Sequence, residues 1–244
     1  MTDNLGDIFG EDEEAPTTRP KSDLVGRVST GYFDKATNTP GQLTEFRFMV
    51  SSKDVAQAVA QRLGGAPLEI EDAKGEFFIQ VQTDAEVLRD VVLAGPDAIY
   101  TDQKWWVNGE LLHHCTGRYY LDDERKGQRC DCPPTFEEKK AKGNRGAKPD
   151  IRVRFTFADD PELGIFELKS SSWMFRKTLH EAVNDVERVG EGGPTVVNIV
   201  NELVEYTPKK GKMANKLVSY RKPLIQARAA YDDAITDAPD PADG

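Results

Sequence analysis

The 244-residue chain has only three cysteines and three histidines, and it has no long apolar run. An odd number of cysteines does not build a disulfide framework, so the sequence favours a reducing, cytoplasmic setting. Because no stretch approaches the ~20 apolar residues of a membrane-spanning helix, we expect no membrane partner. The N-terminus is acidic, whereas a secretory signal would begin with basic residues and continue into an apolar stretch.

The common motifs of nucleotide-dependent enzymes are also absent. The chain has no Gly-x-x-x-x-Gly-Lys-Ser/Thr loop, and no Gly-x-Gly-x-x-Gly follows a predicted strand. His180 falls within a predicted helix, and Ser170 to Ser172 is typical of a helix N-terminus rather than of a nucleophile. The carboxylates show no spacing that nominates an acid and a base. We therefore expect that the protein is not an enzyme.

The charge is strongly negative and uneven. The net charge of −10 excludes a protein that coats nucleic acid through net charge alone. The first fourteen residues hold six carboxylates and no base, and the last fourteen hold five aspartates and no base. From composition we predict disordered acidic tails at 1–22 and 231–244, on either side of a single domain over 23–230.

Periodic apolar residues predict many short strands and few helices. Ser51 to Asp54 supplies a helix N-cap, and Asn108-Gly109 predicts a β-hairpin turn. This order predicts an α+β fold, a mostly antiparallel sheet or small barrel with two amphipathic helices and an inserted zinc loop. The predicted strands are 44–50, 77–82, 87–93, 98–107, 110–115, 151–157, 165–169, 196–206 and 217–220, and the predicted helices are 55–63, 172–189 and a weaker 225–235.

All three cysteines and two of the histidines gather in one short region. His113, His114 and Cys115 end a predicted strand, and Cys130 and Cys132 follow in a polar loop. Thiolate and imidazole together are the ligand set that zinc most often takes, so we predict a structural zinc in an insertion at about 113–149. Neighbouring strand residues point to opposite faces, so His113 shares a face with Cys115, and His114 does so only if the strand turns there.

Other interpretations of this region remain open. The thiols could be free, or the zinc could be catalytic if Glu137 or Glu138 supplied a base. Trp105 and Trp106 could stack on nucleic acid bases. Alternatively, one of them could pack in the core while the other is exposed. The lysine-rich turn at 209–216 could touch phosphate or an acidic partner, or could be a solvated hairpin tip.

Several motifs in a fixed order resemble a known family. They are the run 112–117, Cys130-Asp131-Cys132, a basic stretch at 139–148 before Pro149, the strand 151–155, and the serines 170–172 that open a helix. Over about residues 25–228 the chain resembles the recombination directionality factors of temperate actinobacterial phages, those of Streptomyces phages in particular. Relatives carry a further cysteine just before the proline, where this chain has Gly146-Ala147-Lys148, so the fourth ligand shifts to a histidine.

The resemblance implies a function without catalysis. Such a factor binds a phage large serine integrase in the host cytoplasm and switches it from integration to excision of the prophage, by recombination between the hybrid attachment sites. The factor then has attachment-site DNA as a partner only indirectly, through the integrase. The rival function is a zinc-containing phage single-stranded-DNA-binding protein, and a zinc-dependent hydrolase is a weaker third.

We expect the partner to contact the second half of the chain. Trp173 and Phe175, in the helix 172–189, are candidate apolar anchors. The hairpin offers charges that could steer the protein toward an acidic surface. These are Lys209, Lys210, Lys212 and Lys216.

Overall fold

A computed structural model of the chain describes residues 23–34, 37, 39–70, 75–209 and 214–232. The predicted tails at 1–22 and 231–244 lie outside the described residues, except for Tyr231 and Asp232, and so do Lys210 and Lys212. Among the described residues, no helix has the length and apolar character needed to cross a bilayer.

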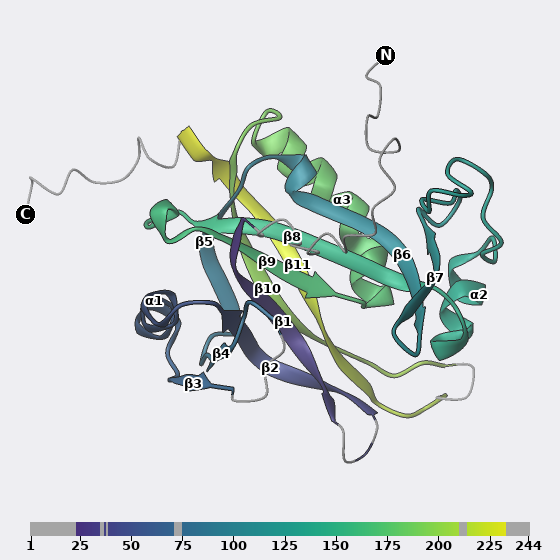
Figure 1. Cartoon of the computed structure of the whole chain (residues 1–244), viewed down its shortest axis with the longest axis horizontal. Coiled ribbons are helices and arrows are strands. Elements are labelled where there is room, and N and C mark those ends of the chain that lie inside the picture. The colour runs from purple at the N-terminus through teal and green to yellow at the C-terminus, as the bar shows by residue number, and fades with distance from the viewer. Residues whose placement is uncertain (1–22, 35–36, 38, 71–74, 210–213, 233–244) are drawn as a thin grey trace, which may run out of the picture.

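Eleven strands form one mixed sheet (Figure 1), in the order β11-β10-β5-β8-β9-β1-β2-β4-β3, with β6 pairing both β8 and β7. All pairs are antiparallel except β1 with β9. The predicted α+β class is therefore confirmed, and of the two predicted arrangements the open sheet is the one found. The strands are β1 (Leu24–Asp34), β2 (Thr39–Val50), β3 (Pro67–Glu69), β4 (Ile79–Gln82), β5 (Val87–Leu93), β6 (Ile99–Val107), β7 (Glu110–Cys115), β8 (Lys148–Phe157), β9 (Ile165–Ser170), β10 (Thr195–Tyr206) and β11 (Val218–Ala230).

Three α-helices accompany the sheet: α1 (Lys53–Leu63), α2 (Phe136–Ala141) and α3 (Trp173–Val189). In Figure 1, α1 lies beside β3 and β4, α2 lies beside β7 at the other end, and α3 lies along one face of the sheet. The two predicted amphipathic helices, α1 and α3, begin at serine N-caps, whereas the short α2 inside the loop was not predicted. The 3-10 helices are η2 (Pro96–Ala98), η3 (Gly143–Arg145) and η4 (Pro161–Leu163).

The core is built from one face of the central strands. In β8, Ile151, Val153, Phe155 and Phe157 are buried, as their alternation predicts. Phe166 of β9 packs edge-on against Phe157, with ring centroids 5.4 Å apart. The opposite face of β8 therefore has only polar side chains to present. These are Lys148, Asp150, Arg152, Arg154 and Thr156.

The structure corrects the predicted elements at both ends of the described chain. The predicted helix at 225–235 is wrong, because residues 225–230 continue β11 and pair with β10. Its alanines favour a helix locally, but Ile225 is buried against the sheet while Gln226 and Arg228 are exposed, which is the alternation of a strand. The strand β1 was not predicted from the sequence either. Gly26 in β1 allows the backbone to approach Val50 closely, because a Cβ at this position would lie 2.8 Å from Val50 Cγ1.

Candidate metal centre

The β6–β7 hairpin positions the first candidate ligands. Asn108 and Gly109 at its turn have positive φ angles of 50° and 91°, as the Asn-Gly pair predicts. The register places His113 opposite Trp105 and Cys115 opposite Gln103. The predicted hairpin is therefore confirmed, and it ends at the first thiol.

The loop after β7 then folds back on itself. Cys115 forms an isolated β-bridge with Tyr120, and the Cys130 N–H donates to the Arg118 carbonyl at 2.8 Å. The Gly117 N–H donates to the Cys115 sulfur at 3.2 Å. These backbone contacts bring Cys130, fifteen residues further along the chain, beside Cys115.

Four side chains converge in a single cluster. The donor atoms of His113, Cys115, Cys130 and Cys132 all lie within 4.8 Å of one another. The Cys115 and Cys132 sulfurs are 3.7 Å apart, and His113 Nε2 is 3.3 Å from the Cys132 sulfur. A tetrahedral zinc ion would set these separations at about 3.8 Å and about 3.5 Å. The donor set and its spacing therefore fit a four-coordinate metal ion.

The acidity of one thiol in the cluster, that of Cys132, also suits a metal. The hydrogen bond from Cys115 outweighs burial and lowers the pKa of Cys132 to about 5, with help from the charge of His113. The same hydrogen bond, together with burial, raises the pKa of Cys115. Cys132 is therefore a thiolate at neutral pH, and the thiolate is the form that binds metal.

The segment that carries the cluster is attached to the core through α2. Thr135 and Glu138 form a capping box at the start of α2, so the Glu138 carboxylate is engaged there. The Lys139 ammonium donates to the Gly117 carbonyl at 2.8 Å. Phe136 meets Trp173 of α3 edge-on, with ring centroids 5.5 Å apart. From α3, Trp173 thus supports the segment that carries the Cys/His cluster.

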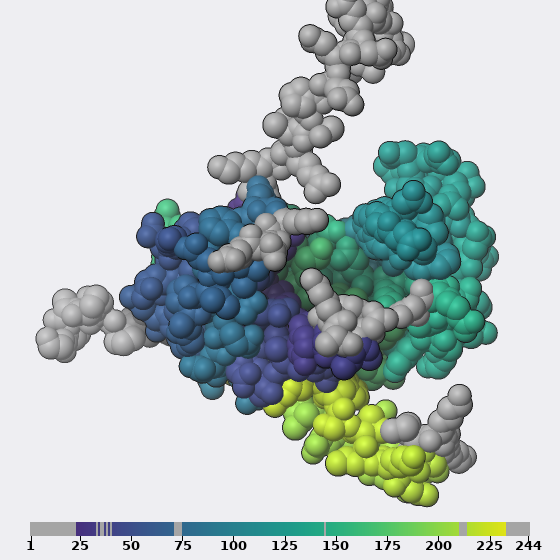
Figure 2. All heavy atoms as spheres, turned by 60° about the horizontal axis from the view of Figure 1, so that its bottom comes forward, coloured from purple at the N-terminus to yellow at the C-terminus, as the bar shows by residue number. Residues whose placement is uncertain are grey.

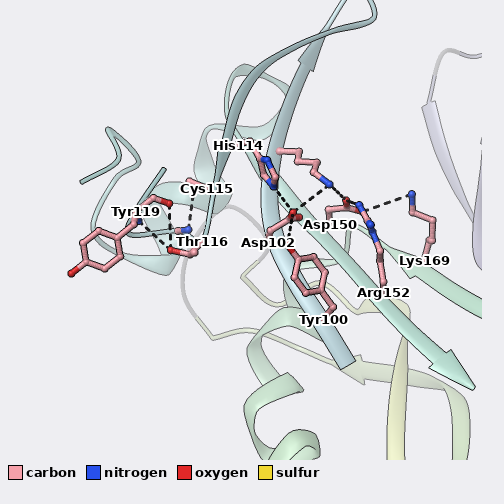
Figure 3. A network of polar contacts seen from close by, with 11 residues as sticks. Tyr100, Asp102, His114, Cys115, Thr116, Tyr119, Asp150, Arg152 and Lys169 are labelled. Carbon is pink, nitrogen blue, oxygen red and sulfur yellow. Dashed lines mark hydrogen bonds and ion pairs between the residues drawn. The ribbon is translucent and has the colours of Figure 1, made fainter. Parts of the chain in front are cut away.

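His114 lies on the other face of β7 and does not join the cluster. Its Nε2 is 2.5 Å from Asp102 Oδ2 (Figure 3), and the Asp102 side chain is almost fully buried. The Tyr100 hydroxyl and the Lys104 ammonium reach the same carboxylate oxygen, at 3.1 Å and 3.3 Å. Of the two candidate histidines, the structure therefore brings only His113 to the cysteines.

The network around Asp102 continues along the polar face of β8. The Asp150 carboxylate accepts from the Lys104 ammonium and the Arg152 guanidinium, each at 2.6 Å, and the Lys169 ammonium of β9 lies 3.9 Å away (Figure 3). Burial would raise the pKa of Asp150, but the hydrogen bonds from Arg152 and Lys104 outweigh it and hold the pKa at about 2. This network was not predicted from the sequence, although the alternating charges of β8 are a signal that could have revealed it.

The predicted partner-contact residues differ in how exposed they are. Phe175 is only 1% exposed and packs in the core, so the expectation that it anchors a partner is wrong. Trp173 is half-buried against Phe136. Lys209 and Lys216 are exposed beside the ends of β10 and β11. Of the paired tryptophans, Trp105 is half-buried and Trp106 is exposed.

Comparison with known proteins identifies a family that matches most of the chain. No solved structure matches the chain. Residues 25–220 match the Gp3-like family, described as recombination directionality factor-like. This match spans β1, the metal-bearing segment, α3 and the start of β11. The chain belongs to the Gp3-like, recombination directionality factor-like family.

Proposed function

We propose that the protein is a recombination directionality factor that binds a phage large serine integrase and switches it from integration to excision. It has no catalysis of its own and acts in the cytoplasm of the bacterial host, with a Streptomyces phage as the expected source. The observation that carries the proposal is the family match over residues 25–220. The Cys/His cluster agrees with it, because four protein donors complete a tetrahedral site and leave no position for a substrate.

The switch is a shift between states of the integrase. A factor that binds the excision-competent arrangement more tightly changes which pair of attachment sites can be bridged. Moving such an equilibrium from 1:99 to 99:1 takes ~5.5 kcal/mol of differential binding. An interface of ordinary size supplies this free energy, so a non-catalytic protein is sufficient.

The surface best suited to the integrase is the distal arm, which we define as residues 203–206 and 217–221. Beyond Val200, β10 has no partner in β5 and pairs only with β11. In Figure 2 the yellow-green residues of this part of the chain project from the body of the protein. Leu203, Tyr206 and Leu217 are large apolar residues that stay exposed there, Leu217 at 65%. Exposed apolar clusters of this kind mark protein interfaces.

Basic residues flank the distal arm. Lys209 and Lys216 are exposed where the two strands approach their connecting turn. Their charge would steer the arm toward an acidic surface, while the apolar residues would provide the buried contact. The arm therefore replaces Phe175 as the proposed anchor, and Trp173 is assigned to support of the metal-bearing segment.

We further propose that the metal is zinc and that its role is structural. Zinc is the metal that most often takes three thiolates and one imidazole in a closed tetrahedral site. The reducing cytoplasm would keep the three thiols available to it. Zinc would then fix the segment at about 113–149 against α3 rather than take part in chemistry.

The test is recombination in vitro with purified integrase from the same phage. Adding the full-length protein should start recombination between the two hybrid sites and suppress joining of the original two. Tyr206→Ser with Leu217→Ser should reduce this effect at least tenfold. Leu68→Ser, at an exposed leucine in β3, is the matched control. If the wild-type protein changes neither reaction, the proposed function is wrong. If the wild-type protein is active and the arm variant is equally active, only the docking surface is wrong.

A further inference from the structure

A large groove lies on the polar face of the sheet. It has a volume of about 1450 Å³ and is bounded by the β1–β2 hairpin, the β6–β7 hairpin and β11, with β8 and β9 as its floor. Figure 2 shows the recess between the purple-blue residues of the first strands and the teal residues of the metal-bearing segment. The groove is separate from the metal cluster, because none of the four candidate ligands lines it.

The groove is strongly basic in a chain whose net charge is −10. Among the described residues, Asp150 is the only carboxylate that lines it, and Lys104, Arg152 and Lys169 already surround that carboxylate. The six basic side chains that line it are Arg47, Lys104, Lys148, Arg152, Lys169 and Arg221. Arg221 also pairs with Glu86, and Lys104 also pairs with Asp102, so the six bases meet three carboxylates. A local excess of positive charge remains, which selects for an anionic ligand.

The strand register concentrates this charge. Lys104 of β6 lies directly opposite Lys148 of β8, and Arg152 of β8 lies directly opposite Lys169 of β9. Like charges directly opposite each other destabilise a sheet. Since natural sequences depart from such local rules chiefly at functional sites, two like-charged pairs on one face indicate a site for an anion.

Two guanidinium groups in the groove have unused donors. The Nε atoms of Arg47 and Arg152 are buried and have no hydrogen-bond partner among the described residues. Burial also lowers the pKa of Arg47, as expected for a cation removed from water without a neighbouring carboxylate. A buried donor without a partner is unfavourable, and a bound anion would supply the missing acceptor.

Aromatic rings lie exposed along the same groove. Tyr32 is 43% exposed and Trp106 is 57% exposed on its walls, with Trp105 half-buried beside them. Tyr100 lies opposite Arg152 in the register, and the guanidinium carbon is 5.7 Å from the centre of its ring. Exposed rings next to cations are the arrangement on which unpaired bases stack.

We propose that this groove binds single-stranded nucleic acid, with backbone phosphates on Lys148, Arg152 and Lys169 and bases stacked on Trp106 and Tyr32. A single strand fits better than a duplex because only unpaired bases offer their faces for stacking. It also fits better than an acidic peptide, which would use the charges but leave the exposed rings without a role. The inference goes beyond the proposed function, which reaches DNA only through the integrase.

The test measures fluorescence anisotropy of a labelled oligothymidine of about 16 nucleotides with the full-length protein, without integrase. Binding should be detectable at low salt, with log K falling by about 0.7 per phosphate contact for each unit of log salt. Three contacts predict a slope of about −2. A duplex of the same length and a polyglutamate peptide are the competitors, and both should compete at least tenfold less well.

Variants separate groove binding from general attraction. Trp106→Ala, and Lys148→Gln together with Lys169→Gln, should each weaken oligothymidine binding at least tenfold, and the lysine pair should also reduce the salt slope. Controls are Tyr119→Ala, at a ring that points away from the polar network (Figure 3), and Lys177→Gln on the exposed side of α3. Unchanged circular dichroism and metal content confirm folding.

Three results would overturn the proposal: no binding at low salt, equal binding by folded groove variants, or polyglutamate that competes as well as the oligonucleotide. In the last case the groove would be a docking site for an acidic peptide. Integrase is absent from this measurement, so a negative result would not bear on the proposed directionality function. A negative recombination assay would likewise not bear on nucleic acid binding in the groove.

Discussion

The imidazole of His114 lies 2.5 Å from the buried carboxylate of Asp102, on the face of β7 opposite the cysteine cluster. His113, one residue earlier, points its Nε2 to within 3.3 Å of the Cys132 sulfur. Two adjacent histidines thus serve different structures, because consecutive strand residues alternate between faces. One belongs to the metal centre and the other to the polar network beneath the groove.

Substitution of each histidine should therefore have a different effect on metal binding. His113→Ala removes a ligand and should weaken zinc affinity by at least about tenfold, since even residues behind the ligands cost that much. His114→Gln keeps a donor for Asp102 and should leave about one zinc per chain, the stoichiometry of a closed site. Metal content after gel filtration, with a competing chelator, measures both. Equal loss in the two variants would contradict the assignment.

Removal of the metal should loosen one segment rather than the whole chain. The cysteines pack with Tyr120 in a small cluster that is separate from the main core. A metal site contributes its binding free energy to the folding of the residues it joins, so chelation should locally unfold residues 113–142. Hydrogen exchange should rise there and stay low in α3 at Leu179 and Val186, which are buried in the main core. Uniform exchange along the chain after chelation would show that the metal holds the entire fold.

The sequence predicts those features that depend on local alternation. The strand β8, the Asn-Gly hairpin and the shared face of His113 and Cys115 all follow from a period of two. The Ser172 N-cap of α3 likewise follows from local chemistry, because the first backbone N–H groups of a helix need an acceptor.

Features that depend on distant residues could not be predicted in this way. Gly26 has weak strand propensity. A glycine is needed at this position of β1 because Val50 and Phe166, which belong to other strands, leave no room for a Cβ. The groove is assembled from Arg47 of β2, Lys104 of β6 and Arg152 of β8, and only the sheet topology brings these together. The predicted helix at 225–235 failed for the same reason, since pairing with β10 outweighs local helix propensity.

The close packing at Gly26 predicts a loss of stability on adding a methyl group. In Gly26→Ala the new Cβ would lie 2.8 Å from Val50 Cγ1 and 3.0 Å from the Phe166 ring. Both neighbours are fully buried, so the clash should lower the free energy of unfolding by about 1–3 kcal/mol in urea denaturation. Gly146→Ala is the milder control, because the atoms nearest to its Cβ, at 3.0 Å and beyond, belong to the exposed Lys142 side chain and not to the core. Equal stability of the two variants would contradict the packing of β1.

The polar network predicts a specific dependence of stability on pH. The folded pKa of Asp150, about 2, lies below its ordinary value of 3.8. Because the folded pKa is depressed, the carboxylate stabilises the fold above about pH 4, and this contribution is lost as the pH falls toward 2. Asp150→Asn should therefore destabilise the protein clearly at pH 6, where it leaves Arg152 without this carboxylate and Lys104 with Asp102 alone. The destabilisation should be about half as large at pH 3.

The measurement is chemical denaturation of wild-type and Asp150→Asn proteins between pH 3 and pH 6. Both are kept in chelator, so that loss of metal in acid contributes equally to each. The matched control is Asp185→Asn, at an exposed carboxylate that pairs with Arg188 on the surface of α3. An exposed pair contributes about 0–1 kcal/mol, so its effect should be small at every pH. A destabilisation by Asp150→Asn that does not shrink as the pH falls would show that Asp150 is not held ionised by its basic neighbours.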